Sequence, residues 1–210
     1  MAAKKKTKKP AAKKKVAKKA TKVGAKKKVA AAPAKVAAKK PAAAKKKPTA
    51  KAASALKAGV PAPDFALRDQ TGRSIKLSDY RGRKLLIYFY PKADTPGCTV
   101  QSCTVRDARK DLTTIGVEVL GISPDQPTTQ SKFDQKYGLG FPLLSDPDHA
   151  TASAYGAWGQ RSMYGRSYMG IIRSSFLVGE DGRLLGAWSP VKPDETVPNA
   201  RATVATAAGR

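Results

Sequence analysis

The first 58 residues of the chain contain almost no side chain from which a hydrophobic core could be built. Apart from Met1, no apolar residue larger than valine occurs before Leu56, and the first acidic and aromatic residues are Asp64 and Phe65. Lysine and alanine dominate loosely repeated blocks such as AAKKKTKKP and AAKKKVAKKA. Because like charges repel and little apolar surface is available, ordering this segment would cost more free energy than its burial could return. We therefore expect residues 1–58 to form a disordered basic tail and residues 59–210 to form one folded domain.

The positive charge of the protein is concentrated in this tail. Residues 1–59 hold 22 of the 41 lysines and arginines, all of them lysine, and no acid, so most of the formal net charge of +26 lies there. The composition resembles the basic tails of linker histones and of some bacterial nucleoid proteins. Clustered lysines bind phosphates by releasing counterions, without reading sequence. The tail therefore predicts nucleic-acid binding, with a solubilising role or contact with anionic membranes as the alternatives.

The N-terminal stretch contains no apolar run long enough to span a bilayer and no hydrophobic region of the kind that a secretory signal needs. We therefore expect a cytoplasmic protein without membrane contact, associated with the nucleoid, or with the nucleus in a eukaryote, if the tail binds DNA. Two cysteines, Cys98 and Cys103, in such a compartment favour thiol chemistry over a structural disulfide framework. With His149 as the one histidine, they cannot fill a four-ligand zinc site, so we expect no metal and no other cofactor.

From residue 59 onward, strand and helix signals alternate, which predicts an α/β fold with a mixed sheet and helices on both faces. The segment that includes Tyr164, Tyr168 and Met169 is punctuated by glycines, and we interpret it as a loop near the pocket mouth. Strands are expected at residues 64–67, 74–77, 84–90, 117–122, 141–144, 174–178 and 183–188, and helices at 98–113, 127–137, 148–155 and, weakly, 194–210.

Cys98 occupies a position suited to a nucleophile. It follows the buried strand expected at 84–90 and the loop at 91–97, and it opens a helix. A thiol attacks as the thiolate, which the free amides and positive dipole end of a helix N-terminus stabilise. The alternative is an inert buried cysteine. Cys103 lies five residues further, about 8.7 Å away in an intact helix, whereas the Cα atoms of a disulfide lie about 4.4–6.8 Å apart. If the two cysteines pair, the first turns of the helix must unwind.

The segment 89–103, FYPKADTPGCTVQSC, resembles the active-site segment of peroxiredoxins of the Q type, also called bacterioferritin comigratory proteins. It satisfies the peroxiredoxin pattern P-x-x-x-T-x-x-C at Pro91, Thr95 and Cys98. The resemblance extends to GIS at 121–123, LLSD at 143–146, YGAWG at 155–159 and GIIRSSFLV at 170–178. It covers residues 60–188, does not include the tail, and implies a thioredoxin-like three-layer α/β/α fold.

The resemblance also implies a thiol peroxidase that reduces hydrogen peroxide and organic hydroperoxides. Cys98 would be the peroxidatic nucleophile and pass through a sulfenic acid. Thr95 would hydrogen-bond the thiolate and the peroxide, Arg173 would stabilise the thiolate and the transition state, and Pro91 would shield the pocket from water. Cys103 matches the resolving cysteine that forms a disulfide with Cys98. Thioredoxin or a similar dithiol protein would reduce that disulfide, and we take the chain to be a monomer.

Two other functions remain open at this stage: a nucleic-acid compaction protein with a thioredoxin-like module, and a peroxide sensor that passes its oxidation to a partner. Catalytic turnover would distinguish an enzyme from both. Several other residues are interpreted as structural: His149 as a surface or capping residue, Tyr155 and Trp158 as packing residues, and Asp94 and Asp107 as solvated or capping charges.

Overall fold

The computed structural model describes residues 56–163 and 165–208. Tyr164 and most of the expected basic tail lie outside these residues. Seven strands form a mixed sheet in the order β2-β1-β5-β4-β3-β8-β9, in which β3, β4 and β5 are parallel neighbours and the other pairs are antiparallel. The strands are β1 (Ala66–Asp69), β2 (Ser74–Lys76), β3 (Lys84–Phe89), β4 (Val117–Ser123), β5 (Leu143–Ser145), β8 (Ser174–Val178) and β9 (Leu184–Trp188).

The central strand β3 is buried on both faces, as its continuous apolar sequence predicts. Successive side chains of a strand point to opposite faces, so the run divides between two core clusters. Leu86, Tyr88 and Tyr90 belong to one cluster, and Leu85, Ile87 and Phe89 belong to the other.

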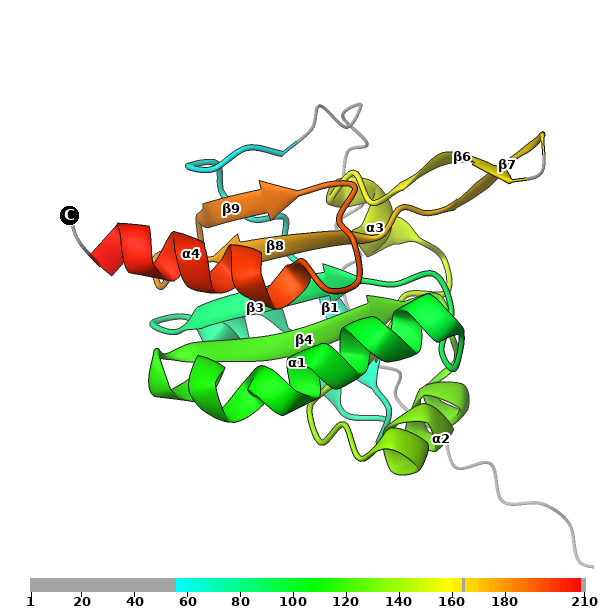
Figure 1. Ribbon diagram of the computed structural model, residues 1–210, viewed down its shortest axis with the longest axis horizontal. Helices are drawn as coiled ribbons and strands as arrows, with labels where there is room; N and C mark the ends of the chain where they lie inside the picture. Colours follow the sequence, from blue (N-terminus) through cyan, green and yellow to red (C-terminus); the bar gives the residue numbers. More distant parts are fainter. Residues whose placement is uncertain (1–55, 164, 209–210) are drawn as a thin grey trace, which may run out of the picture. The chain divides into compact units, whose positions relative to one another are not determined.

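Helices cover both faces of the sheet, which confirms the expected three-layer arrangement. The long helices α1 (Pro96–Thr114), α2 (Pro127–Tyr137) and α4 (Thr196–Ala208) pack on the first cluster and lie toward the viewer in Figure 1. The short helix α3 (Ala150–Ala154) and the 3₁₀ helix η1 (Leu77–Tyr80) pack on the second cluster with the segment that follows Leu56. None of the helices described by the structure is both long and apolar enough to cross a bilayer.

The loop expected before Arg173 is instead a β-ribbon, so that prediction was wrong. Strands β6 (Trp158–Met163) and β7 (Arg166–Ile171) pair antiparallel as a separate two-stranded sheet, which projects away from the seven-stranded sheet (Figure 1). Tyr168 and Met169 are 40% and 56% exposed. Because backbone pairing forms this ribbon with little burial, its sequence lacks the apolar alternation by which strands are recognised.

The residues at the expected tail–domain boundary are attached to the edge of the sheet. Leu56 packs against the second core cluster, and the Gly59 N–H donates to the Leu184 carbonyl oxygen at 2.7 Å. Pro61 forms a bridge with Arg183. A truncation that removes the basic tail must therefore keep Leu56.

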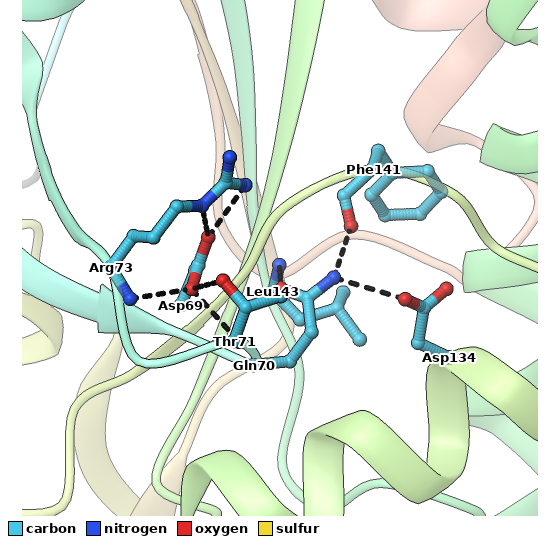
Figure 2. A network of polar contacts seen from close by, with 7 residues as sticks. All are labelled: Asp69, Gln70, Thr71, Arg73, Asp134, Phe141 and Leu143. Atoms are coloured by element: carbon cyan, nitrogen blue, oxygen red, sulfur yellow. Dashed lines mark hydrogen bonds and ion pairs between the residues drawn. The ribbon is translucent and has the colours of Figure 1, made fainter.

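The turn between β1 and β2 is organised by the buried carboxylate of Asp69 (Figure 2). Its Oδ1 accepts from the Thr71 N–H and hydroxyl at 2.8 and 2.7 Å and from the Arg73 N–H at 2.9 Å. Its Oδ2 accepts from Arg73 Nε at 2.9 Å. Burial alone would raise the pKa of Asp69, but the hydrogen bonds from Thr71 and Arg73 hold it below its ordinary value.

The neighbouring Gln70 joins this turn to the segment between α2 and β5 (Figure 2). Its Nε2 donates to Asp134 Oδ2 at 3.1 Å and to the Phe141 carbonyl oxygen at 3.0 Å, and its Oε1 accepts from the Leu143 N–H at 2.8 Å. The turn is thus bonded to α2 and to the start of β5.

Candidate active site

Cys98 lies in the first turn of α1, immediately beyond the carboxyl end of β3. Thr95 is the N-cap residue with extended backbone (φ −106°, ψ 152°), and Pro96 is the first helical residue, where its missing N–H costs nothing. Cys98 is 1% exposed, and the first amides of the helix have no intrahelical acceptor. The sulfur therefore lies at the positive end of a 19-residue helix, as the sequence predicted.

Arg173 meets Cys98 from the segment between β7 and β8. Its Nη2 donates to Cys98 Sγ at 3.4 Å, which joins two residues separated by 75 positions. Gly97 permits this approach, because a Cβ atom at that position would lie 3.1 Å from Nη2. The sequence placed Arg173 at the site only through the family resemblance, and the structure brings its guanidinium to the sulfur.

Gln101 is a residue of the candidate site that the sequence analysis missed. Its Oε1 accepts from Arg173 Nη1, and its Nε2 donates to Thr196 Oγ1 at 2.8 Å. Gln101 and Thr196 are both fully buried. Gln101 thus holds one branch of the guanidinium while the other branch reaches Cys98. The available signal was its position three residues after Cys98, which places both side chains on one helix face.

Thr95 and Pro91 lie in the loop before α1, both partly buried. The Thr95 hydroxyl donates to the Lys92 carbonyl oxygen at 2.9 Å. Among the described residues it makes no hydrogen bond to Cys98, so the expected contact with the sulfur is not present in this state. The oxygen lone pairs of Thr95 remain able to accept a hydrogen bond from a ligand O–H.

The same loop is fixed from two sides. The Ala93 N–H donates to Asp125 Oδ2 at 2.7 Å, beyond the end of β4. Asp94 adopts a left-handed conformation (φ 56°), and its carboxylate accepts from Lys136 Nζ at 2.8 Å and from the Tyr137 hydroxyl at 2.7 Å. These two hydrogen bonds lower the pKa of Asp94. Asp94 is exposed, as expected for a solvated charge, but it also ties the loop to α2.

Cys103 lies on the same helix as Cys98, and the two are free thiols. Helix α1 is continuous from Pro96 to Thr114. Cys103 is partly buried against the first core cluster. This is the intact geometry in which the two Cα atoms stand about 8.7 Å apart, too far for a disulfide.

The residues interpreted as structural lie in packing or surface positions. Tyr155 is buried, its hydroxyl donates to the Pro63 carbonyl oxygen at 2.9 Å, and Trp158 packs against the second cluster, as predicted. The ring of His149 stacks on Trp158 with centroids 3.8 Å apart, where His149 precedes α3. Asp107 is exposed and pairs with Arg106 at 2.8 Å.

The AhpC/TSA family model matches residues 58–186, which include every residue of this site except Thr196. The chain therefore belongs to the AhpC/TSA family. A putative peroxiredoxin of Mycobacterium tuberculosis is 50% identical over 137 residues, covering 65% of this chain and 87% of the relative. Peroxiredoxin Bcp of Escherichia coli is 51% identical over 129 residues, covering 61% and 83%.

Solved structures narrow the family to one type. Peroxidoxin BcpB of Mycobacterium tuberculosis superposes with a TM-score of 0.65 at 33% identity, covering 72% of this chain and 97% of that one. Peroxiredoxin Q of Xanthomonas campestris gives a TM-score of 0.63 at 34% identity, covering 71% and 95%. The protein is a peroxiredoxin of the Bcp, or peroxiredoxin Q, type, with a thioredoxin-like fold and peroxidase function.

Proposed function

We propose that the protein reduces hydrogen peroxide and organic hydroperoxides by attack of the Cys98 thiolate on the O–O bond. The sulfur bonds to the terminal peroxide oxygen and is oxidised to the sulfenic acid, while the other peroxide oxygen leaves as hydroxide or alkoxide and takes up a proton. The observation that carries this proposal is the 3.4 Å contact between Arg173 Nη2 and Cys98 Sγ at a helix N-terminus. Two sources of positive potential converge there on one sulfur atom.

Arg173 is proposed to stabilise the thiolate and the negative charge that develops on the leaving oxygen. A guanidinium is planar and carries five donors, so one branch can stay on Gln101 while the other serves the sulfur and the peroxide. The Thr95 hydroxyl already donates to Lys92, which supports a role as acceptor for the peroxide O–H. Pro91 is proposed to limit the access of water to the same pocket.

The sulfenic acid is proposed to be resolved by Cys103. Condensation of Cys98–SOH with the Cys103 thiol forms the S–S bond and releases water. Because the two cysteines share an intact helix, this step requires the first turns of α1 to unwind. Thioredoxin or a similar dithiol protein would then supply the two electrons that return both thiols.

A mass spectrum taken after one equivalent of hydroperoxide tests these assignments. The parent protein should contain an intramolecular Cys98–Cys103 disulfide, and Cys103→Ser should carry one added oxygen atom on Cys98. Disulfides that are only intermolecular would contradict the role of Cys103, and an unmodified Cys98 would contradict the mechanism. Continuous turnover with catalytic amounts of a dithiol protein separates an enzyme from a peroxide sensor that reacts once.

We also propose that the Lys/Ala-rich tail tethers the peroxidase to nucleic acid. The 22 lysines of residues 1–59 are uninterrupted by acids. Neutralising several phosphates releases counterions and gives an affinity that falls steeply with salt. The remaining residues carry a net charge of only +4, which offers no comparable run of positive charge.

Deleting residues 1–50 tests the tether, because this removes 20 lysines and keeps Leu56. DNA affinity should be measured at two or more salt concentrations, together with peroxide turnover. We expect most binding and most of its salt dependence to disappear, with turnover in dilute buffer unchanged. A full-length chain whose tail lysines are glutamines serves as the control for length. Tight DNA binding by either variant would refute the tether.

A further inference from the structure

Two buried side chains lie on α1 between the cysteines, and each is bonded to a different element. The Ser102 hydroxyl shares a 2.9 Å hydrogen bond with the Tyr88 hydroxyl of β3. Gln101 Nε2 donates to Thr196 Oγ1, at the first position of α4, at 2.8 Å. All four residues are fully buried. Tyr88 and Thr196 have no part in the proposed chemistry, yet they hold the segment that must move.

Unwinding the helix between Cys98 and Cys103 would break both contacts. Gln101 and Ser102 would move with the backbone, while Tyr88 remains in the sheet and Thr196 remains on α4. The Tyr88 hydroxyl would lose its partner beneath the helix, where a buried polar group without a hydrogen bond is costly. Burial also raises the pKa of Tyr88 well above its ordinary value, so this hydroxyl stays neutral and needs a hydrogen-bond partner.

The second contact also links the site to α4. Helix α4 packs on the same core cluster as α1, and Arg201 of α4 pairs with Asp111 of α1 at 2.6 Å. Figure 1 shows the two helices on the same face of the sheet. These contacts hold Thr196 in place independently of the segment between the cysteines. Thr196 would therefore stay where it is when that segment unwinds.

We propose that Tyr88 and Thr196 form a latch that sets how the Cys98 sulfenic acid divides between two reactions. This proposal rests on the resolving role of Cys103. In one reaction Cys98–SOH and Cys103–SH form the disulfide and water. In the other, a second hydroperoxide oxidises the sulfenic acid to the sulfinic acid and is itself reduced to the alcohol or to water. The latch keeps α1 folded, which slows the first reaction and leaves time for the second.

The test compares Tyr88→Phe with Tyr155→Phe. Both tyrosines are buried and each loses one hydroxyl hydrogen bond, but Tyr155 belongs to the opposite core cluster and bonds to the Pro63 carbonyl oxygen. Tyr88→Phe should speed disulfide formation about 2- to 10-fold, which corresponds to the net contribution of one neutral hydrogen bond. It should raise by a similar factor the peroxide concentration needed for half-maximal sulfinic acid. The rate constant for the first oxidation of Cys98 should not change.

Thr196→Val and Thr196→Ser provide a second pair. Valine removes the acceptor of Gln101 at nearly constant volume, whereas serine keeps it, so only valine should speed resolution. Rates are followed by quenched-flow mass spectrometry, and the free energy of unfolding is measured for every variant. The latch is refuted if Tyr88→Phe and Thr196→Val resolve at the rate of Tyr155→Phe and Thr196→Ser. If the parent protein forms no Cys98–Cys103 disulfide, the resolving role of Cys103 is refuted, and the latch, which depends on it, is refuted as well.

Discussion

The turn between β1 and β2 and the neighbourhood of Cys98 are both polar networks around a buried group, Asp69 in one and Cys98 in the other, but they are assembled differently. In the turn, Asp69 is satisfied by Thr71 and Arg73, two and four residues away. At the active site, Arg173 reaches Cys98 and Gln101 across 75 and 72 positions. The turn network forms wherever its short segment folds, whereas the active-site network exists only after the whole sheet has assembled.

The two networks also differ in how many contacts hold each group. Asp69 accepts from several donors in a single turn, so the loss of one contact leaves the others in place. Within the described residues, Cys98 Sγ has one hydrogen-bond donor, Arg173 Nη2. Multiple local contacts provide stability, whereas under the proposed mechanism single distant contacts would let the sulfur and the helix change partners during the reaction. Substitutions should therefore affect stability in one region and the reaction rate in the other.

The largest effect is expected for Cys98→Ser. A serine hydroxyl is a far weaker nucleophile than a thiolate, so peroxide turnover should fall at least about a thousandfold, to the uncatalysed background. The free energy of unfolding should change little, because serine fits the same space. Stopped-flow peroxide consumption and urea denaturation measure the two quantities, and retained turnover would remove Cys98 from the reaction.

A smaller loss is expected for Arg173→Lys. Lysine keeps the positive charge but cannot hold Gln101 and the sulfur together, so the rate constant for peroxide should fall roughly 10- to 100-fold. The matched control is Arg166→Lys on the exposed strand β7, which should leave the rate unchanged. Equal rate constants for peroxide in these two variants would show that the reaction does not depend on the guanidinium geometry of Arg173.

For Asp69→Asn we expect a loss of stability with no change in the reaction rate. Asparagine replaces a carboxylate oxygen that accepts from Arg73 with an NH₂ donor, so the free energy of unfolding should fall by about 1–3 kcal/mol. The peroxide rate constant should stay at the parent value. Asp181→Asn is the control, because Asp181 accepts from the Arg183 N–H in an exposed turn, where the change should stay within about 0.5 kcal/mol. A loss of activity without a loss of stability would contradict the division between the two networks.

The smallest effect concerns the pH dependence of stability. Because the folded protein lowers the pKa of Asp69, the unfolded chain binds more protons than the folded one between the lowered value and the ordinary value. The contribution of Asp69 should be fully present above about pH 4 and be lost as the pH falls through the lowered pKa. Asp69→Asn should therefore lose less stability than the parent protein on acidification. Identical pH profiles in chemical denaturation would contradict this assignment.

Much of the fold could be predicted from the sequence, because most elements bury a face and burial leaves a periodic pattern. The run at 84–90 became β3, and the helices expected at 98–113 and 127–137 became α1 and α2 with boundaries that differ by at most two residues. The ribbon of β6 and β7 was missed because its strands pair with each other and bury little. The active-site loop was located correctly, but its ties to Asp125 and Lys136 depend on the positions of distant elements.

The sequence by itself determined that 22 lysines gather in residues 1–59 while every aromatic residue lies beyond them, since charge and apolar content are properties of composition. It also determined that Cys98 opens a helix after a buried strand, because both elements are local. Only the tertiary structure decided which side chains meet the sulfur and which hold its helix. Arg173, Gln101 and Thr196 lie on three segments, and the contacts among them depend on sheet order and helix packing. Local periodicity reports which face of an element is buried, but it carries no information about the partner across that interface.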